Sequence, residues 1–164
     1  TGASYAPRWG KTDGRRFPRM RWPDGRAHYA LSPHGEETLA ADARAFARLM
    51  RHLRETDPQH TVIMVQVENE AGSYQLMRDH APGPARLFEQ PIPADRATAM
   101  GVARRPWAEA FGPRAEQFFM TWHLARYVDR VAEAGKREWA GPMYVNAALG
   151  NAFTDEQVNS SFYQ

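Results

Sequence analysis

The sequence predicts an α/β protein, because long amphipathic helices alternate with short apolar strands. A helix is expected over residues 33–55 and is followed closely by a strand at 61–67. A second long helix at 114–134 leads into another short strand at 142–147. This order makes one β-α-β unit with a helix before it, the pattern of a parallel sheet covered by helices.

The first helix has a defined start, a regular apolar stripe and a defined end. Ser32-Pro33 offers a side-chain cap and then proline at the first helical position. Asp57-Pro58 ends the helix, because the residue before a proline avoids the α region. Apolar residues recur between these points at steps of four and three. They are Leu39, Ala43, Phe46, Met50 and Leu53.

The strand at 61–67 is β-branched and almost continuously apolar, as in a strand covered on both faces. Residues 71–112 follow it as a long loop rich in glycine and proline, with one short helix near 94–100 that Gly101 ends. Loops longer than about 12–15 residues are uncommon in compact domains and are usually functional or disordered. The position of this loop after a strand therefore indicates a functional region.

The remaining segments complete this picture. Residues 1–31 show no sustained period and are expected to be irregular. The helix at 114–134 opens after Pro113, ends at Gly135 and carries a broad apolar surface. No repeat or linker divides the chain, so we treat residues 1–164 as one unit.

Composition limits the class of protein. The chain has 164 residues, enough for one domain but short of the roughly 250 residues of a (β/α)₈ barrel. Leu, Ile, Val and Phe make up 26 of the 164 residues, about 16%, which is a thin aliphatic core. The net charge of +2 argues against a disordered chain. There is no cysteine, which excludes disulfides and thiolate metal sites.

Several partners are not expected. No apolar run approaches the roughly 20 residues of a membrane helix, and the first residues lack the pattern of a signal peptide. All but two of the 21 basic residues are arginines, but they are dispersed among 19 acids, so we expect no nucleic-acid partner. The histidines do not form a metal-binding spacing, and no cofactor is expected. The compartment and the oligomeric state stay open.

The acidic end of the first strand is the strongest functional signal. In α/β proteins the chemistry lies where strands end at their carboxyl edge. Gln66, Glu68 and Glu70 share parity, so a regular strand would direct them to one face. Burial there raises the pKa of a carboxyl group, as a general acid requires. The alternative is that Glu68 and Glu70 are solvated charges; for Glu68, we favour a buried structural role over a catalytic one.

These residues resemble a known family. The sequence Val-Gln-Val-Glu-Asn-Glu at 65–70, followed by Gly-Ser-Tyr at 72–74, is similar to the signature of glycoside hydrolase family 35. This is the β-galactosidase family in the clan of (β/α)₈ retaining glycosidases. Residues 4–9 and 16–18 resemble the loop after the third barrel strand, and 142–147 resemble the fifth strand. The resemblance implies an internal fragment of one catalytic TIM-barrel domain, spanning 1–164.

The resemblance also implies roles for individual residues. Glu70 would be the general acid/base in the hydrolysis of terminal β-galactosides, and Asn69 would hydrogen-bond the 2-hydroxyl of the sugar. The nucleophile would be a second Glu, expected beyond residue 164. Ala71 departs from the family pattern, because many members have Tyr at this position.

Further substrate contacts are expected from the second strand and from aromatic side chains. Tyr144 and Asn146 share parity near the end of the strand at 142–147 and would point the same way as Glu70 in a barrel. Four aromatic residues lie in segments expected at the loop face, where a flat ring can stack on a sugar. They are Tyr5, Trp9, Tyr74 and Trp107.

Two residues outside this site receive structural interpretations. Asp79 is expected to be a turn or cap residue, and His123 a hydrogen-bonded histidine at a packing edge. An alternative hypothesis for the whole chain is a catalytically inert fragment that acts at most as a binding or assembly segment. Such a fragment could assemble because unpaired strand edges can pair with other chains.

Overall fold

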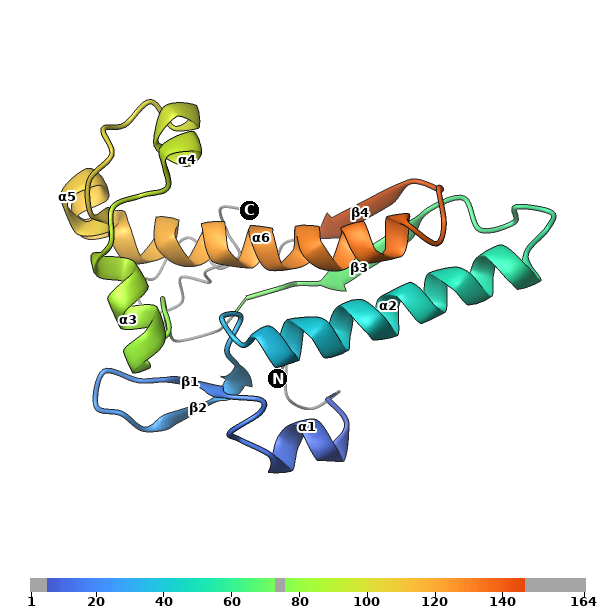
Figure 1. Ribbon diagram of the computed structural model, residues 1–164, viewed down its shortest axis with the longest axis horizontal. Coiled ribbons are helices and arrows are strands. Elements are labelled where there is room, and N and C mark those ends of the chain that lie inside the picture. Colours follow the sequence, from blue (N-terminus) through green and yellow to red (C-terminus); the bar gives the residue numbers. More distant parts are fainter. Residues whose placement is uncertain (1–5, 73–75, 147–164) are drawn as a thin grey trace, which may run out of the picture.

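The computed structural model describes residues 6–72 and 76–146 as a mixed α/β fold. Two long helices, α2 (Glu36–Thr56) and α6 (Ala115–Lys136), run side by side along the longest axis of the molecule (Figure 1). Strands β3 (Val65–Asn69) and β4 (Met143–Asn146) pair in parallel. Because α6 lies between these strands in the chain, the predicted β-α-β unit is confirmed. The described residues hold two two-stranded sheets and do not show a complete barrel.

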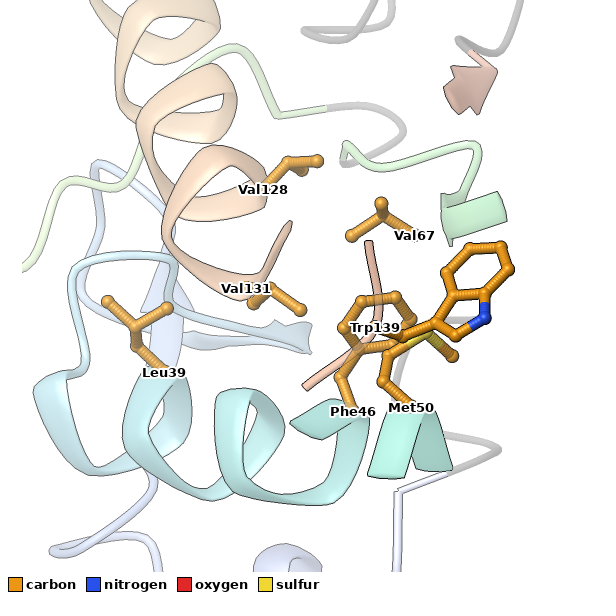
Figure 2. Packing of buried hydrophobic residues seen from close by; sticks show 7 residues of the cluster. All are labelled: Leu39, Phe46, Met50, Val67, Val128, Val131 and Trp139. Atoms are coloured by element: carbon orange, nitrogen blue, oxygen red, sulfur yellow. The ribbon is translucent and has the colours of Figure 1, made fainter. Parts of the chain in front are cut away.

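The core between the two helices combines aliphatic side chains with the rings of Phe46 and Trp139 (Figure 2). It comprises Leu39, Phe46, Met50, Val67, Val128, Val131 and Trp139. Gly135 was expected to end the second helix, but α6 continues to Lys136 and Gly135 is buried inside it. A Cβ atom at Gly135 would lie 2.3 Å from Cε1 of Phe46. The glycine is therefore a point of close helix approach.

Helix α2 begins three residues later than expected, at Glu36. The Ser32 hydroxyl does not cap it, because it donates to Oδ2 of Asp79 at 2.6 Å and accepts from the backbone N–H of His34 at 3.2 Å. Residues 33–34 form a turn, and Gly35 occupies the N-cap position. The two acids at the start of α2, Glu36 and Glu37, suit the positive end of the helix dipole.

Strand β3 begins four residues later than expected. The Asp57 carboxylate accepts hydrogen bonds from the backbone N–H of Thr61 at 2.9 Å, from its hydroxyl at 2.7 Å, and from the N–H of Val62 at 2.9 Å. These bonds hold the start of the segment out of the sheet. Ile63 and Met64 are 74% and 51% exposed, so the expected coverage of both strand faces is wrong for this segment in the described structure.

The N-terminal segment is more ordered than expected. It contains a short helix, α1 (Arg8–Thr12), and an antiparallel hairpin of β1 (Arg19–Arg21) and β2 (Ala27–Leu31). Gly25, with φ of 84°, lies in the connection between the two strands. Met20 and Ala30 of the hairpin pack against the middle of α6.

The long segment before α6 contains three short helices where one was expected. They are α3 (Pro82–Glu89), α4 (Ala94–Ala99) and α5 (Trp107–Phe111), and a 3₁₀ turn, η1 (Gly112–Arg114), joins them to α6. Helix α4 confirms the predicted helix at 94–100, and Gly101 follows it with φ of 66°. These helices gather at the N-terminal end of α6 (Figure 1).

Asp79 is more than the expected turn residue. Its buried carboxylate accepts hydrogen bonds from the backbone N–H of Arg21 at 2.9 Å, the hydroxyl of Ser32 at 2.6 Å and the N–H of Ala81 at 2.8 Å. The bond to Ala81, two residues on, is the local contact typical of a turn residue. The other two fasten the hairpin to the segment that precedes α3.

Candidate active site

The site is built where β3 ends. The strand stops at Asn69, and Glu70 has a φ of 51°, a left-handed conformation that is costly for a residue with a Cβ atom. The regular row of Gln66, Glu68 and Glu70 is therefore wrong at its last position, because the backbone bends before Glu70 can continue the alternation. The bend places Glu70 at the surface of the described structure.

A network of amide side chains holds this bend. The backbone N–H of Glu70 donates to Oδ1 of Asn146 at 3.0 Å. The Oδ1 atom of Asn69 accepts from Nδ2 of Asn146 at 3.1 Å and from Nε2 of Gln66 at 3.0 Å. Three of the four expected site residues, Asn69, Glu70 and Asn146, are thus brought together by the parallel pairing of β3 and β4.

Tyr144, the fourth expected site residue, takes no part in that network. It lies opposite Gln66 in the sheet register and is 46% exposed. Its place on β4 is two residues before Asn146, at the side of the network away from Glu70. Tyr144 therefore lies on the exposed surface of the strand pair and does not contact the bend through this network.

A second polar cluster lies beside the first and was not anticipated as a group. Glu68 is hydrogen-bonded to Asp42 of α2, and the Tyr127 hydroxyl of α6 donates to Oδ2 of Asp42 at 2.9 Å. Burial, together with the charge and the hydrogen bond of Asp42, raises the pKa of Glu68 to about 8. Burial raises the pKa of Tyr127 as well, and the neighbouring Asp42 and Glu68 add to this increase. The expected structural pairing of Glu68 fits this arrangement.

Both clusters line one cleft. Its volume is about 1020 Å³, and its lining includes Asp42, Glu68, Asn69, Glu70, Tyr127 and Trp9. Trp9 is half-exposed, and its ring centroid lies 5.1 Å from that of Phe17, which also lines the cleft. Clefts of this size accept small organic ligands, and an exposed indole offers a flat apolar surface to them.

The other expected aromatic contacts have different outcomes. Trp107 is 1% exposed and packs in the core at the N-terminal end of α6, so its expected place at the loop face is wrong. Tyr5 and Tyr74 lie outside the described residues. Of the two that the structure describes, Trp9 lines the cleft and Trp107 does not.

His34 and His123 form a partly buried pair that does not line the cleft. Their ring centroids are 4.4 Å apart, and His123 also contacts Phe119 and Trp122, so its expected place at a packing edge becomes a place inside an aromatic cluster. Burial lowers the pKa of His34 to about 4. Burial, with the nearby His34 and Arg126, lowers the pKa of His123 to about 3.

Within the described residues, no three His, Asp or Glu side chains gather in a way that suits a metal ion. In the same part of the chain, no helix combines the length and the apolar character that crossing a membrane requires.

Asp42 is the main residue that sequence reasoning missed. It lies three residues after Leu39 and four before Phe46, both buried, so it stands next to the inward stripe of α2. An acid beside such a stripe requires a partner. The position of Asp42 beside the apolar stripe could therefore have marked it as a paired acid, although it does not identify Glu68 as the partner.

Comparison of the chain with protein-family models and with curated proteins finds no match. The fold and the site therefore define a mixed α/β protein with a strand-end carboxylate and amide network, and any assignment beyond that class is a proposal.

Proposed function

We propose that the chain is part of a β-galactosidase-like retaining glycoside hydrolase in which Glu70 is the general acid/base. The observation that carries this proposal is the position of Asn69 and Glu70. They lie at the carboxyl end of a parallel strand, are bonded to Asn146 at the end of the neighbouring strand, and line a cleft of about 1020 Å³. Chemistry in parallel α/β folds concentrates at this edge.

In the proposed reaction, Glu70 donates a proton to the glycosidic oxygen as the bond to the leaving group breaks. A second carboxylate attacks the anomeric carbon and forms a glycosyl-enzyme, and Glu70 then removes a proton from the water that hydrolyses it. We place this nucleophile outside residues 1–164. Glu68 is unsuited to the role, because two side chains of one strand cannot flank a sugar from opposite sides.

Asn69 is proposed to bind the 2-hydroxyl of the sugar. Its Oδ1 atom already accepts two hydrogen bonds, from Gln66 and Asn146. We therefore assign the contact with the hydroxyl to the Nδ2 group, which is a donor only. Asn146 would act mainly by holding both Asn69 and the backbone of Glu70.

The same proposal makes β3 and β4 the fourth and fifth strands of a (β/α)₈ barrel. Their parallel pairing across a helical crossover supports this. So does the exposure of large apolar side chains around the pair, since neighbouring strands would cover such surface. These side chains are Ile63, Met64, Tyr144 and Val145.

The test is a comparison of leaving groups. In the complete polypeptide that contains this sequence, Glu70→Gln should slow hydrolysis of lactose-like substrates by about 10²–10⁴-fold, with a much smaller effect on activated aryl galactosides that need no proton donor. The matched control is Glu55→Gln, an exposed acid on α2, which should leave both rates unchanged. Equal rates of the wild type and Glu70→Gln on lactose would remove Glu70 from the role.

A second candidate function is a catalytically inert binding or assembly segment. The exposed apolar surface of Ile63, Met64 and Val145 favours it, because such surface beside the edges of a two-stranded sheet promotes association. The complete polypeptide that contains this sequence distinguishes the two. Turnover that Glu70→Gln abolishes supports the enzyme, whereas concentration-dependent association in sedimentation, without turnover, supports the segment.

A further inference from the structure

Three elements meet at the carboxyl pair on the cleft wall. Asp42 comes from α2, Glu68 from β3 and Tyr127 from α6. The Tyr127 hydroxyl donates to Oδ2 of Asp42 at 2.9 Å, and Glu68 hydrogen-bonds the same carboxyl group. A hydrogen bond between two carboxyl groups requires one proton between them, since two ionised carboxylates repel.

This pair is close to the acid/base residue along the chain. Between Glu68 and Glu70 there is only Asn69, and on the other side Val67 is fixed in the core between α2 and α6. A left-handed conformation such as that of Glu70 persists only where its surroundings hold it in place. Asn146 holds the backbone N–H of Glu70 from β4, and the bond from Glu68 to Asp42 fastens the preceding strand end to α2.

We propose that Asp42 and Glu68 form a proton-sharing pair that positions Asn69 and Glu70, and that loss of the shared proton releases this strand end from α2. The inference rests on the proposed function in one respect, namely that Glu70 is the group whose position matters for catalysis. Asp42 and Glu68 are positioning residues in this proposal.

The groups around Asp42 and Glu68 favour a single titration, the loss of the shared proton, as the event that breaks the pair. Among the residues that the structure describes, the titratable groups that face Glu68 are Asp42 from α2 and Tyr127 from α6, while β4 carries neither a carboxylate nor a base. The raised pKa of Tyr127 keeps its hydroxyl a donor. The pKa of Glu68, near 8, places the release in the mildly alkaline range.

The test follows the wild-type chain by NMR, with ¹³C-labelled carboxyl groups and the backbone amide of Glu70 as reporters. The Glu68 carboxyl should titrate near pH 8, and the Glu70 amide should shift with the same midpoint. Glu68→Gln should abolish the alkaline transition of the Glu70 amide, and Asp42→Asn should move the Glu68 midpoint to lower pH. Glu133→Gln, an exposed acid on α6, is the matched control and should change neither.

Two results would overturn the inference: titration of Glu68 at its ordinary value near 4.5, or a Glu70 amide without an alkaline transition. Both are read from the wild type, so the inference stays testable if Glu68→Gln fails to fold.

A binding measurement separates this inference from the proposed function. In the complete polypeptide that contains this sequence, affinity for methyl β-galactoside should fall by about tenfold between pH 7 and pH 9 and stay constant in Glu68→Gln, because only the unsubstituted protein loses the shared proton. Binding with a pH-independent affinity would contradict the positioning pair and leave the proposed function standing. A coupled NMR titration without galactoside binding at any pH would support the pair and contradict the proposed function.

Discussion

The two ends of helix α6 are packed in different ways. Its C-terminal half meets α2 and β3 through small and aliphatic groups, with Val131 and Gly135 fully inside the contact. Its N-terminal half meets α3, α4 and α5 through large rings, with Trp107 and Phe119 at the centre. We call the C-terminal half of α6, which lies close to α2, the aliphatic end. We call its N-terminal half, where rings fill the space between α6 and the short helices, the aromatic end.

The two ends of α6 should tolerate different kinds of substitution. At the aliphatic end the separation of two backbones is fixed by the lack of a side chain at Gly135, so added volume is harmful. At the aromatic end the short helices have little regular contact of their own, so the rings carry the packing and lost volume is harmful.

Removal of a ring should damage the aromatic end most. Trp107 is fully buried, with ring centroids of Phe119 and Trp122 at 5.4 and 5.8 Å. Trp107→Ala should lower the free energy of unfolding by about 3–5 kcal/mol in urea titrations. Trp9→Ala, at an exposed indole that contacts one buried ring, is the control and should change it by about 1 kcal/mol or less. A loss below about 1 kcal/mol for Trp107→Ala would show that the rings do not carry this end.

Loss of the Asp79 carboxylate should have the second-largest effect on the free energy of unfolding. Asp79→Ala leaves the backbone N–H of Arg21, the hydroxyl of Ser32 and the N–H of Ala81 without their buried acceptor. We expect a loss of about 3 kcal/mol in the free energy of unfolding. Asp79→Asn keeps one acceptor oxygen and should recover part of it. Equal losses for both variants would mean that the bonds are not the cause.

A single added methyl group should damage the aliphatic end. Gly135→Ala should cost about 2 kcal/mol, because its Cβ atom would overlap the ring of Phe46. Gly83→Ala is the matched control, since a Cβ atom there meets nothing within 4 Å and alanine favours the α3 helix. Thermal unfolding of the two variants should therefore shift in opposite directions, and a stabilised Gly135→Ala would contradict the close approach.

The histidine pair should have the smallest effect on the free energy of unfolding near neutral pH, and a larger effect in acid. His34 and His123 have folded-state pKa values lowered to about 4 and 3, so the unfolded chain binds more protons than the folded one below about pH 6.5. Stability should therefore fall as the pH drops from about 6.5 to 4. His123→Phe should flatten this dependence in urea titrations, whereas His52→Asn, at an exposed site, should leave it unchanged.

The fold was predictable where the sequence is periodic. The α2 and α6 helices and strand β4 were found because apolar residues recur at regular steps or in a short apolar run. The start of β3 and of α2 was wrong because single polar side chains, Asp57 and Ser32, bind backbone or carboxylate groups that the pattern does not reveal. Helix α3 and the hairpin were missed since short elements have no period to read, although Asp24-Gly25 is a turn signal.

The site was predictable at the level of strand ends. Asn69, Glu70 and Asn146 meet because parallel strands end at a common edge, which chain order alone implies. The bend at Glu70 and the partnership of Asp42 with Glu68 were not predictable. The first depends on a side chain 76 positions away, and the second on the rotation of α2 over the sheet.

The Asp57 carboxylate has a consequence for the order of events during folding. Its bonds to Thr61 and Val62 span only four or five residues, whereas the bonds from α2 to Glu138 span more than eighty. Short loops close much faster than long ones, so the connection between α2 and β3 can form before the two long helices meet. Asp57→Ala should then slow refolding more than it accelerates unfolding, as expected for a contact made early, at the folding nucleus.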